Sequence, residues 1–396
     1  MNVLITAILI LLISLLILEI KHKSRPKSPI KIKLKDWSTS KKPYGLNIVG
    51  SIEIKNIDKR MEVMIPEFKI NPILLGNKDI KDIEFKTSIS SNHQDQESRD
   101  DNYWEAYIVK SRKKTSINFS IDITNIKTES IGNAIENIWL DMIWYDYGPF
   151  GRLRRREGVN LAIMKPKKVS TENISFTDKT HARVAPIKTH ILGSLDKPIN
   201  VLEYYVKDII KTGDIITMGE TPLAIMQGRY IHPENINPGI VSKLCCKLFH
   251  PTSSLATACG LQSLIDIVGP SRVLVSCLIG VIGKAIGVKG LFYRIAGNQA
   301  RLIDDITGTT PPYDQTLVLG PQNPQALCEE LSSLLSTNIA VVDVNDLGRV
   351  KILAASKHTD LMLLHNVLLD NPAGNANQKT PIVLVRPSNK SQHNLK

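Results

Sequence analysis

Two acidic groups in the C-terminal half of the chain have the residue types and the spacing to hold a hard cation. Asp304 and Asp305 lie in the segment RLIDDITG, directly before the turn-rich TTPPY. Asp343 and Asp346 lie in VVDVNDLGR, at the end of a strand-like apolar run. Mg²⁺ and Mn²⁺ favour oxygen ligands, typically one or two carboxylates completed by substrate phosphates. The alternative is that these aspartates cap turns, as aspartate frequently does.

The common nucleotide-binding and hydrolase motifs are missing. The segment GVIGKA at residues 280–285 resembles a phosphate loop, but a Walker A loop needs glycine in place of Leu278 and serine or threonine in place of Ala285. No GxGxxG, GxSxG or HExxH sequence occurs. The glycines of this segment are interpreted as turn or packing residues, with a backbone cradle for phosphate as the alternative.

The elements around the aspartates predict a mixed α/β domain over residues 187–387. The segment VLEYYVKDIIK at 201–211 has apolar residues at helical spacing, and the strand-like IITM follows it. The run at 273–283 has 11 uncharged residues before Lys284 and is too short to span a membrane. Further strand-like runs lie at 316–319, 339–342 and 382–385, and a helix is predicted at 325–336.

The N-terminal half has the pattern of an antiparallel β-sandwich, predicted over residues 45–168. All four tryptophans precede residue 145 and all five cysteines follow residue 244, which supports two folding units. The basic tracts at 152–156 and 165–168 fall at the expected join, where we interpret them as a solvated edge and linker, with membrane or phosphate contact as the alternative. Apolar residues alternate with polar ones at 48–54, 85–89, 104–108, 117–123 and 138–144.

The net charge of +12 on 396 residues is concentrated beside an apolar N-terminal segment. Residues 21–42 carry +8 of this charge, whereas the first 18 residues have no charged side chain. Eighteen helical residues cover about 27 Å, close to the roughly 30 Å of a bilayer core. We therefore predict an uncleaved transmembrane anchor at residues 1–20 and a basic tether at 21–44, with a cleaved signal sequence as the alternative.

Charge and cysteine content also limit the partners and the compartment. The basic residues after the apolar segment predict a single-pass membrane protein with its C-terminal domains in the cytoplasm. The remaining +4 gives the body no broad basic face, so nucleic acid is not an expected partner. Five cysteines without a CxxC pair indicate neither a disulfide framework nor a zinc site. The oligomeric state stays open, a homo-oligomer included.

Four short segments, in this order, resemble the coenzyme F-420 γ-glutamyl ligase family. The resemblance extends over about residues 187–387 and includes neither the N-terminal segment nor the sandwich. The predicted fold is therefore α+β, with a transmembrane helix, an antiparallel β-sandwich and a mixed α/β domain that resembles the ligase. The segments are TGDIITMGETPLAIMQGR at 212–229, LVLGPQNPQA at 317–326, IAVVDVNDLGR at 339–349 and TPIVLVR at 380–386.

The resemblance implies a chemistry and places some of its residues. Members of that family use GTP and Mg²⁺ or Mn²⁺ to activate a carboxylate acceptor as an acyl phosphate, which the amine of glutamate then attacks. In this chain Asp304 falls at the metal-ligand position, with Asp305 beside it. Gly348 and Arg349 match the closing Gly-Arg turn and are the expected nucleotide or phosphate contacts.

Three departures from the family pattern bear on activity. Asn345 stands where the family has an aspartate, so a second metal ligand has to come from Asp343 or Asp346. The lysine expected in the first turn falls near 221–222, and Gln227 replaces the acidic residue before Gly-Arg. The alternative function is therefore a non-catalytic, membrane-tethered binding or assembly protein that retains the ligase-like fold.

Overall fold

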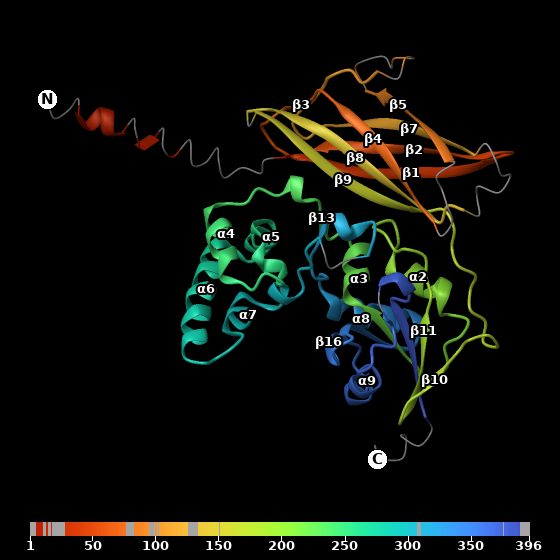
Figure 1. The fold of residues 1–396 in the computed structure, drawn as a ribbon. Coiled ribbons are helices and arrows are strands. Elements are labelled where there is room, and N and C mark those ends of the chain that lie inside the picture. The colour runs from red at the N-terminus through yellow and green to blue at the C-terminus, as the bar shows by residue number, and fades with distance from the viewer. Residues whose placement is uncertain are drawn as a thin grey trace.

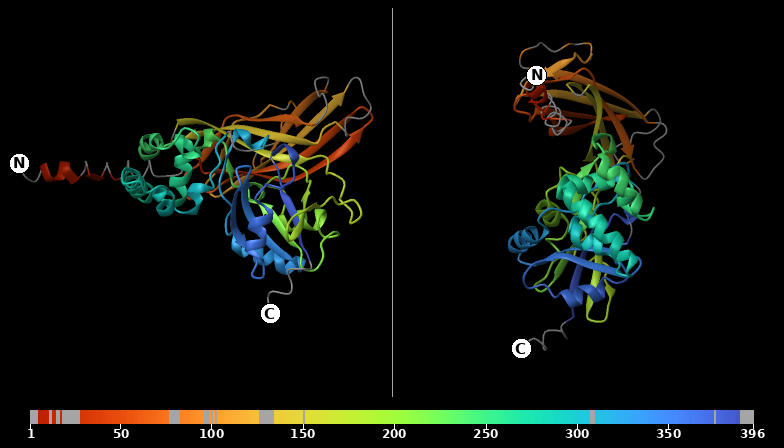
Figure 2. Two further views of the ribbon diagram at one scale, coloured as in Figure 1. Left: turned by 60° about the horizontal axis from the view of Figure 1, so that its bottom comes forward. Right: turned by 90° about the vertical axis from the view of Figure 1, so that its left-hand side faces the viewer.

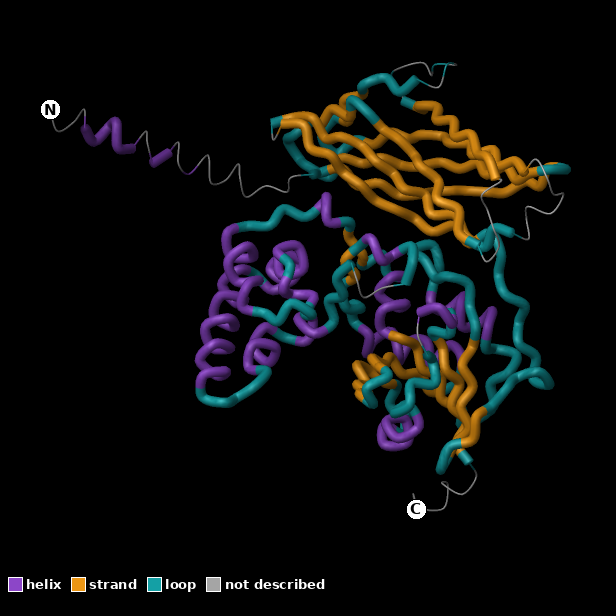
Figure 3. The backbone as a smooth tube through the Cα atoms, in the orientation of Figure 1, coloured by secondary structure: helices purple, strands orange, loops and turns teal. Residues whose placement is uncertain are grey.

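The chain folds into a β-sandwich, an α/β domain and a helical unit inserted into the α/β domain (Figure 1). The sandwich lies above the other two parts, and the helical unit lies to one side of the α/β domain (Figures 1 and 2). Strands dominate the sandwich and helices the inserted unit (Figure 3). The computed structural model describes residues 5–10, 13–14, 17, 28–76, 83–93, 95, 99, 101, 103–125, 134–149, 151–306, 310–374 and 376–388.

The first sheet of the sandwich begins earlier than the sequence pattern predicts. Its antiparallel strands have the order β1-β2-β7-β5, and β1 already starts at Ile30. The structure thus differs from the predicted tether at 21–44, because Ile32 and Leu34 are buried while Lys31 and Lys33 point outward. Lysines occupy the exposed positions of β1, so the high charge of this segment concealed the alternation of buried and exposed residues that is typical of a strand. The bounds are β1 (Ile30–Lys42), β2 (Gly45–Asn56), β5 (Ile83–Asn92) and β7 (Lys114–Asn125).

The second sheet packs its inner face against the first. Its order is β4-β8-β3-β6, with β9 paired to the other side of β8. Fully buried side chains such as Ile52, Ile121 and Leu140 form the shared core, and removing such apolar surface from water is the main stabilising contribution. The bounds are β3 (Val63–Ile65), β4 (Phe68–Leu75), β6 (Tyr107–Val109), β8 (Asn137–Gly148) and β9 (Gly151–Ala162).

The basic tract at 152–156 is part of β9, and the linker interpretation is wrong for it. The buried Arg155 places its Nε 3.1 Å from Asp146 Oδ2 on the neighbouring strand. Arg154 reaches Glu234 at 2.6 Å, outside the sandwich. Carboxylate partners on both sides therefore allow these arginines to lie within a sheet at the domain boundary.

The α/β domain is built on a six-stranded sheet with the order β10-β11-β17-β12-β15-β16. Only β12 and β15 run parallel to each other; the other neighbouring pairs are antiparallel. The strands predicted at 339–342 and 382–385 lie within β15 and β17, which confirms them. The bounds are β10 (Thr177–Asp178), β11 (Ala182–Ile187), β12 (Ile215–Gly219), β15 (Asn338–Asn345), β16 (Arg349–Ala355) and β17 (Ile382–Pro387).

Helices cover both faces of this sheet. α2 (Pro198–Tyr205), α3 (Glu220–Met226) and α8 (Pro324–Leu335) share one core with it, and α9 (Leu361–Val367) packs on the opposite face. α8 confirms the helix predicted at 325–336. The helix predicted at 201–211 is shorter, because the backbone leaves the helical region at Val206, where φ is −123°.

The inserted unit has a small core of its own. Gly280 and Gly283 allow close packing on the next helix, since a Cβ on Gly283 would lie 2.4 Å from Leu291 Cδ1. This supports the packing interpretation of these glycines. The helices are α4 (Ile240–Cys245), α5 (Ala258–Val268), α6 (Pro270–Ala285) and α7 (Leu291–Ala296), with 3-10 turns η3 (Cys246–Leu248), η4 (Ser254–Ala256) and η5 (Asn298–Arg301).

The structure describes only part of the predicted anchor. A short helix covers residues 5–10, whereas residues 1–4, 11–12, 15–16 and 18–20 of the anchor and 21–27 of the tether lie outside the described residues. Within the part of the chain that is described, no single helix has the length and hydropathy of a membrane span. α5 and α6 reach that length only together, and they are bent by 117°.

An aromatic cluster joins the sandwich to the α/β domain. The ring of Trp139 on β8 lies 5.2 Å from that of Tyr313, which lies 5.1 Å from Tyr230. Tyr230 donates a hydrogen bond to the carbonyl of Gly158 at 2.8 Å. Tyr313 is 1% exposed. The remaining short elements lie around this junction and the final turn: β13 (Tyr230–Ile231), η2 (Pro233–Asn235), η6 (Tyr313–Gln315), β14 (Leu317–Val318) and η7 (Ala376–Gln378).

We expect the substitution Gly158→Ala to destabilise this junction. A Cβ at position 158 would lie 1.9 Å from Trp139 Cζ2, so the indole or the strand has to move. Overpacking of this kind costs about 1–3 kcal/mol, and thermal unfolding should show a midpoint several degrees below wild type. Gly148→Ala in the same hairpin is the control, because its Cβ would have only one neighbour, at 3.7 Å. Equal midpoints for the two variants would contradict the account.

Candidate functional site

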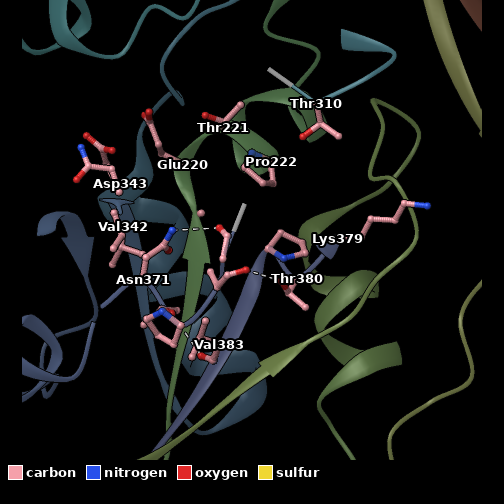
Figure 4. A pocket seen from close by; sticks show the side chains of 18 of the residues that line it. Glu220, Thr221, Pro222, Thr310, Val342, Asp343, Asn371, Lys379, Thr380 and Val383 are labelled. Carbon is pink, nitrogen blue, oxygen red and sulfur yellow. Dashed lines mark hydrogen bonds between the residues drawn. The ribbon is translucent and has the colours of Figure 1, made fainter. Parts of the chain in front are cut away.

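Two carboxylates meet because two parallel strands end in register. Gly219 at the end of β12 pairs with Val342 of β15. The next residues along the two strands are Glu220 and Asp343, and neighbouring strands lie about 4.8 Å apart. Figure 4 shows both side chains on the same side of a pocket. The register of β12 against β15 is therefore what brings these acids together.

A third carboxylate comes from a segment far along the chain. The backbone of Asp304 exchanges two hydrogen bonds of 2.9 Å with Val318 of β14, which holds its side chain beside α3. There Thr221 Oγ1 donates to Asp304 Oδ2 at 3.1 Å. The electrostatic influence of Asp304 and Asp343 on Glu220 shows that the three acids form one group. Glu220, Asp304 and Asp343 are called the acidic triad below.

The acidic triad lines a cavity of about 790 Å³ that also has a basic side. This volume lies within the range of small-molecule sites. In Figure 4 Lys379 lies across the pocket from the acids. The polar and charged residues of the lining include Thr189, His190, Glu220, Thr221, Arg301, Asp304, Thr310, Asp343, Asn345, Asp346, Arg349, Asn371, Lys379 and Thr380.

Burial and neighbouring carboxylates raise the pKa values of Glu220 and Asp304. Burial, followed by the charges of Asp304 and Asp343, raises the pKa of Glu220 to about 9. Burial also raises the pKa of Asp304 to about 6, with Asp343 adding to the shift and the Thr221 hydroxyl opposing it. Glu220 is thus neutral at pH 7, and within the described part of the chain its Oε2 has no hydrogen-bond partner. Groups with such shifts in a pocket are typical of functional sites.

Basic residues of β16 face the acidic triad. Lys351 pairs with Asp343 across the two strands, and Arg349 pairs with Asn345 at the hairpin end. Both cations oppose the rise in the pKa of Glu220. Burial lowers the pKa of Lys351, and its buried Nζ forms no hydrogen bond with any residue that the structure describes. Glu220 lines the cavity, whereas Lys351 lies behind it and acts on the acids through its charge.

The structure separates the two neighbouring aspartates of the first acidic group. Asp304 faces the pocket, whereas Asp305 turns toward the helical unit and accepts a hydrogen bond of 2.6 Å from Thr257. Asp305 is not among the residues that line the cavity. Successive residues of an extended segment point in opposite directions, which explains the separation.

The second acidic group and the Gly-Arg turn form one rim of the cavity. Asp346 accepts a hydrogen bond of 2.7 Å from Asn371 Nδ2. Gly348 has φ +73°, a conformation that favours glycine, and lets the β15–β16 hairpin close so that Arg349 reaches the lining. Asn345 Oδ1 accepts from the amides of Leu347 and Arg349, so the asparagine at this position shapes the turn.

The acids do not form a ready three-ligand metal site. Among the described residues, no three histidine, cysteine, aspartate or glutamate side chains are arranged to hold one metal ion. A Mg²⁺ or Mn²⁺ ion bound by two of these carboxylates would need phosphate or water oxygens to complete its shell, as these ions commonly do.

Sequence patterns alone did not identify Glu220, Arg301 and Lys351. Glu220 and Arg301 lie within quoted segments and Lys351 lies two residues after one, but their roles depend on pairing between distant segments. The one local signal for Glu220 was a carboxylate directly after the apolar run IITM and a glycine, which is the end of a buried strand. The same signal had indicated Asp343.

Comparison with known families finds a match in the sandwich. Residues 31–165 match the N-terminal Ig-like domain of F420-0:gamma-glutamyl ligase. The family suggested by the sequence motifs is thereby supported, but in a different place: the motifs lie at 187–387, and the expectation that the likeness leaves out the sandwich is corrected. The match covers about a third of the chain. No curated protein matches this chain.

The raised pKa of Glu220 leads us to expect that the free energy of unfolding decreases as pH rises. In the unfolded chain Glu220 loses its proton near pH 4.5, whereas in the folded protein it keeps it until about pH 9. The folded state therefore binds more protons in this window, and unfolding becomes easier as pH increases. Glu220→Gln should remove much of this dependence and stabilise the protein at about pH 8 by a few kcal/mol, since one pKa unit corresponds to about 1.4 kcal/mol.

Unfolding midpoints of wild type and Glu220→Gln, measured between about pH 5 and pH 9, check this prediction. Glu330→Gln, an exposed change on α8, is the matched control and should follow wild type throughout. The account would be contradicted if Glu220→Gln and wild type kept a constant difference over the whole range.

Proposed function

We propose that the cavity is the active site of a γ-glutamyl ligase-like enzyme that uses GTP and Mg²⁺ or Mn²⁺ to join glutamate to a carboxylate acceptor. The observation that carries the proposal is the convergence of Glu220, Asp304 and Asp343 beside Arg301 and Arg349 in one cavity. The match of the sandwich to the N-terminal domain of such ligases supports it.

The donors around the acidic triad suit a hard divalent cation. They are carboxylate oxygens, and among the described residues no group forms a hydrogen bond with the buried Glu220 Oε2. Asp304 and Asp343 would hold the cation, with Glu220 ionising when positive charge arrives beside it. When bound, the cation would neutralise phosphate charge during transfer.

Two arginines in the cavity lining suit the phosphates of a nucleotide. Arg301 and Arg349 offer planar guanidinium groups, which match phosphate oxygens. In the proposed reaction a carboxylate oxygen of the acceptor bonds to the γ-phosphorus, and the bond from that phosphorus to GDP breaks. The glutamate amine then attacks the acyl carbon, and inorganic phosphate and a proton leave. These cations would hold the reacting groups in line.

Isothermal titration of the full chain in detergent with GTP and Mn²⁺ tests this site. Wild type should bind, and Asp304→Asn or Asp343→Asn should weaken binding at least about tenfold, which corresponds to about 1.4 kcal/mol. The reason is that each change removes a negative oxygen ligand while it keeps the side-chain size.

Asp305→Asn is the matched control, because its side chain lies off the cavity. The variant keeps one acceptor oxygen for Thr257 and loses the acceptor for the Ile306 amide, a change outside the cavity. It should bind as wild type does. Lack of binding by wild type, or equal losses at positions 304 and 305, would rule out the proposed site.

A non-catalytic binding or assembly role is the second candidate. It is favoured by the lack of a three-ligand metal group in the described residues and by Gln227, whose side chain exchanges hydrogen bonds of 2.9 and 2.7 Å with the backbone of Gln322. A structural role thus occupies the position where the ligases carry an acid. GTP hydrolysis that depends on glutamate would exclude this candidate, and nucleotide-independent capture of a partner would favour it.

We also propose that residues 1–20 anchor the protein in a membrane with the domains on the cytoplasmic side. The uncharged N-terminal segment and the lysines after it support this orientation. Intact-mass measurement should find residues 1–21 retained, and protease added outside sealed cells should leave the sandwich intact. Loss of the segment from the mature chain, or cleavage of the sandwich from outside, would contradict the anchor.

A further inference from the structure

The outer face of α6 is apolar and exposed. Apolar residues recur every four positions along one side of the helix: Leu274, Leu278 and Ile282 within α6, and Ile286 at its C-cap. Their exposed fractions are 40%, 65%, 61% and 70%. The opposite side buries Val273 and Cys277 in the core of the helical unit. A helix in water usually has charged residues where α6 has this stripe.

α4 repeats the arrangement beside α6. Two apolar residues of α4, Ile240 and Leu244, are more than half exposed, and so is Leu248 in the turn that follows the helix. Cys245 of α4 and Cys277 of α6 both lie in the core of the helical unit, so the two helices are neighbours through their inner faces. In Figure 1 α4 and α6 form the outer edge of the helical unit. We call the exposed apolar residues of α4 and α6 the helical outer face.

The helical unit is strongly basic. Residues 239–303 contain seven lysines and arginines and a single acid, Asp266. Lys243 and Lys247 flank the apolar residues of α4, and Lys284 and Lys289 lie at the end of α6. All four are exposed, and none forms an ion pair with another described residue. Apolar side chains bordered by unpaired lysines are typical of helices that lie in a bilayer interface.

We propose that the helical outer face docks on the surface of an anionic bilayer. Each basic residue near such a surface contributes favourably, whereas a second copy of the same unit would bring like charges together. The buried inner sides of α4 and α6 place the helices along the surface rather than across the bilayer. The described helix at residues 5–10 projects from the same side of the molecule as the helical unit (Figures 1 and 2). The inference does not depend on the proposed reaction.

Tryptophan fluorescence of the full chain, reconstituted with vesicles that contain brominated phosphatidylcholine and about one third phosphatidylserine, tests the contact. Leu278→Trp places an indole on the helical outer face. Leu334→Trp on α8 is the matched control, because Leu334 is another helical leucine with a similar exposure of 61%. The four native tryptophans are subtracted with the wild-type chain as reference.

After this subtraction, the emission of the indole at position 278 should shift to the blue, and bromine should quench at least about half of its intensity. The emission of the indole at position 334 should show neither change. With phosphatidylcholine alone, or in the variant Lys284→Glu/Lys289→Glu, quenching at position 278 should fall several-fold. Equal quenching at the two positions would overturn the proposal. An indole at position 278 that is shielded from water but not quenched by bromine would also overturn the proposal, because protein would then cover the helical outer face. Sedimentation in detergent would show whether that protein is a second copy of the chain.

Discussion

The constraint on which the structure depends is the gathering of three carboxylates where two parallel strands end. β12 and β15 place Glu220 and Asp343 next to each other, and β14 adds Asp304 from the other side. Like charges at such separations in a partly dry pocket repel, so protons must stay bound or cations must come close. The buried core of the α/β domain offsets this cost. A sequence that keeps such an arrangement departs from what stability alone would select, as functional sites do.

The sandwich contacts two segments of the cavity wall. Trp139 packs edge-on against Tyr313, which sits in the loop that brings Thr310 to the cavity. Lys379, across the pocket from the acids, forms an ion pair with Glu136 of the sandwich. The N-terminal domain that resembles those of the ligases therefore contacts two segments of the cavity wall. This gives a physical reason for the two domains to occur in one chain.

Period-two alternation of apolar residues predicted β2, β5, β7 and β8 of the sandwich but not β3, β4 or β9. Short apolar runs predicted β12, β15 and β17, because these central strands are buried on both faces of their sheet. Both patterns failed at β1, where five lysines made Ile30–Lys42 look like a solvated tether. For the site, the positions of Asp304 and Asp343 could be predicted from acids at strand ends. Glu220 and Lys351 could not, since their roles arise from pairing between β12, β15 and β16, and Asp305 was separated from its neighbour only by the direction of its side chain.

Anomalous diffraction at the manganese edge, from crystals grown with GTP and Mn²⁺, tests whether the acidic triad holds a divalent cation beside a nucleotide. The account predicts one anomalous peak within coordination distance of Asp304 and Asp343, with phosphate density between it and Arg349. A cavity without a peak at saturating Mn²⁺ and GTP, or a peak held by other residues, would contradict it.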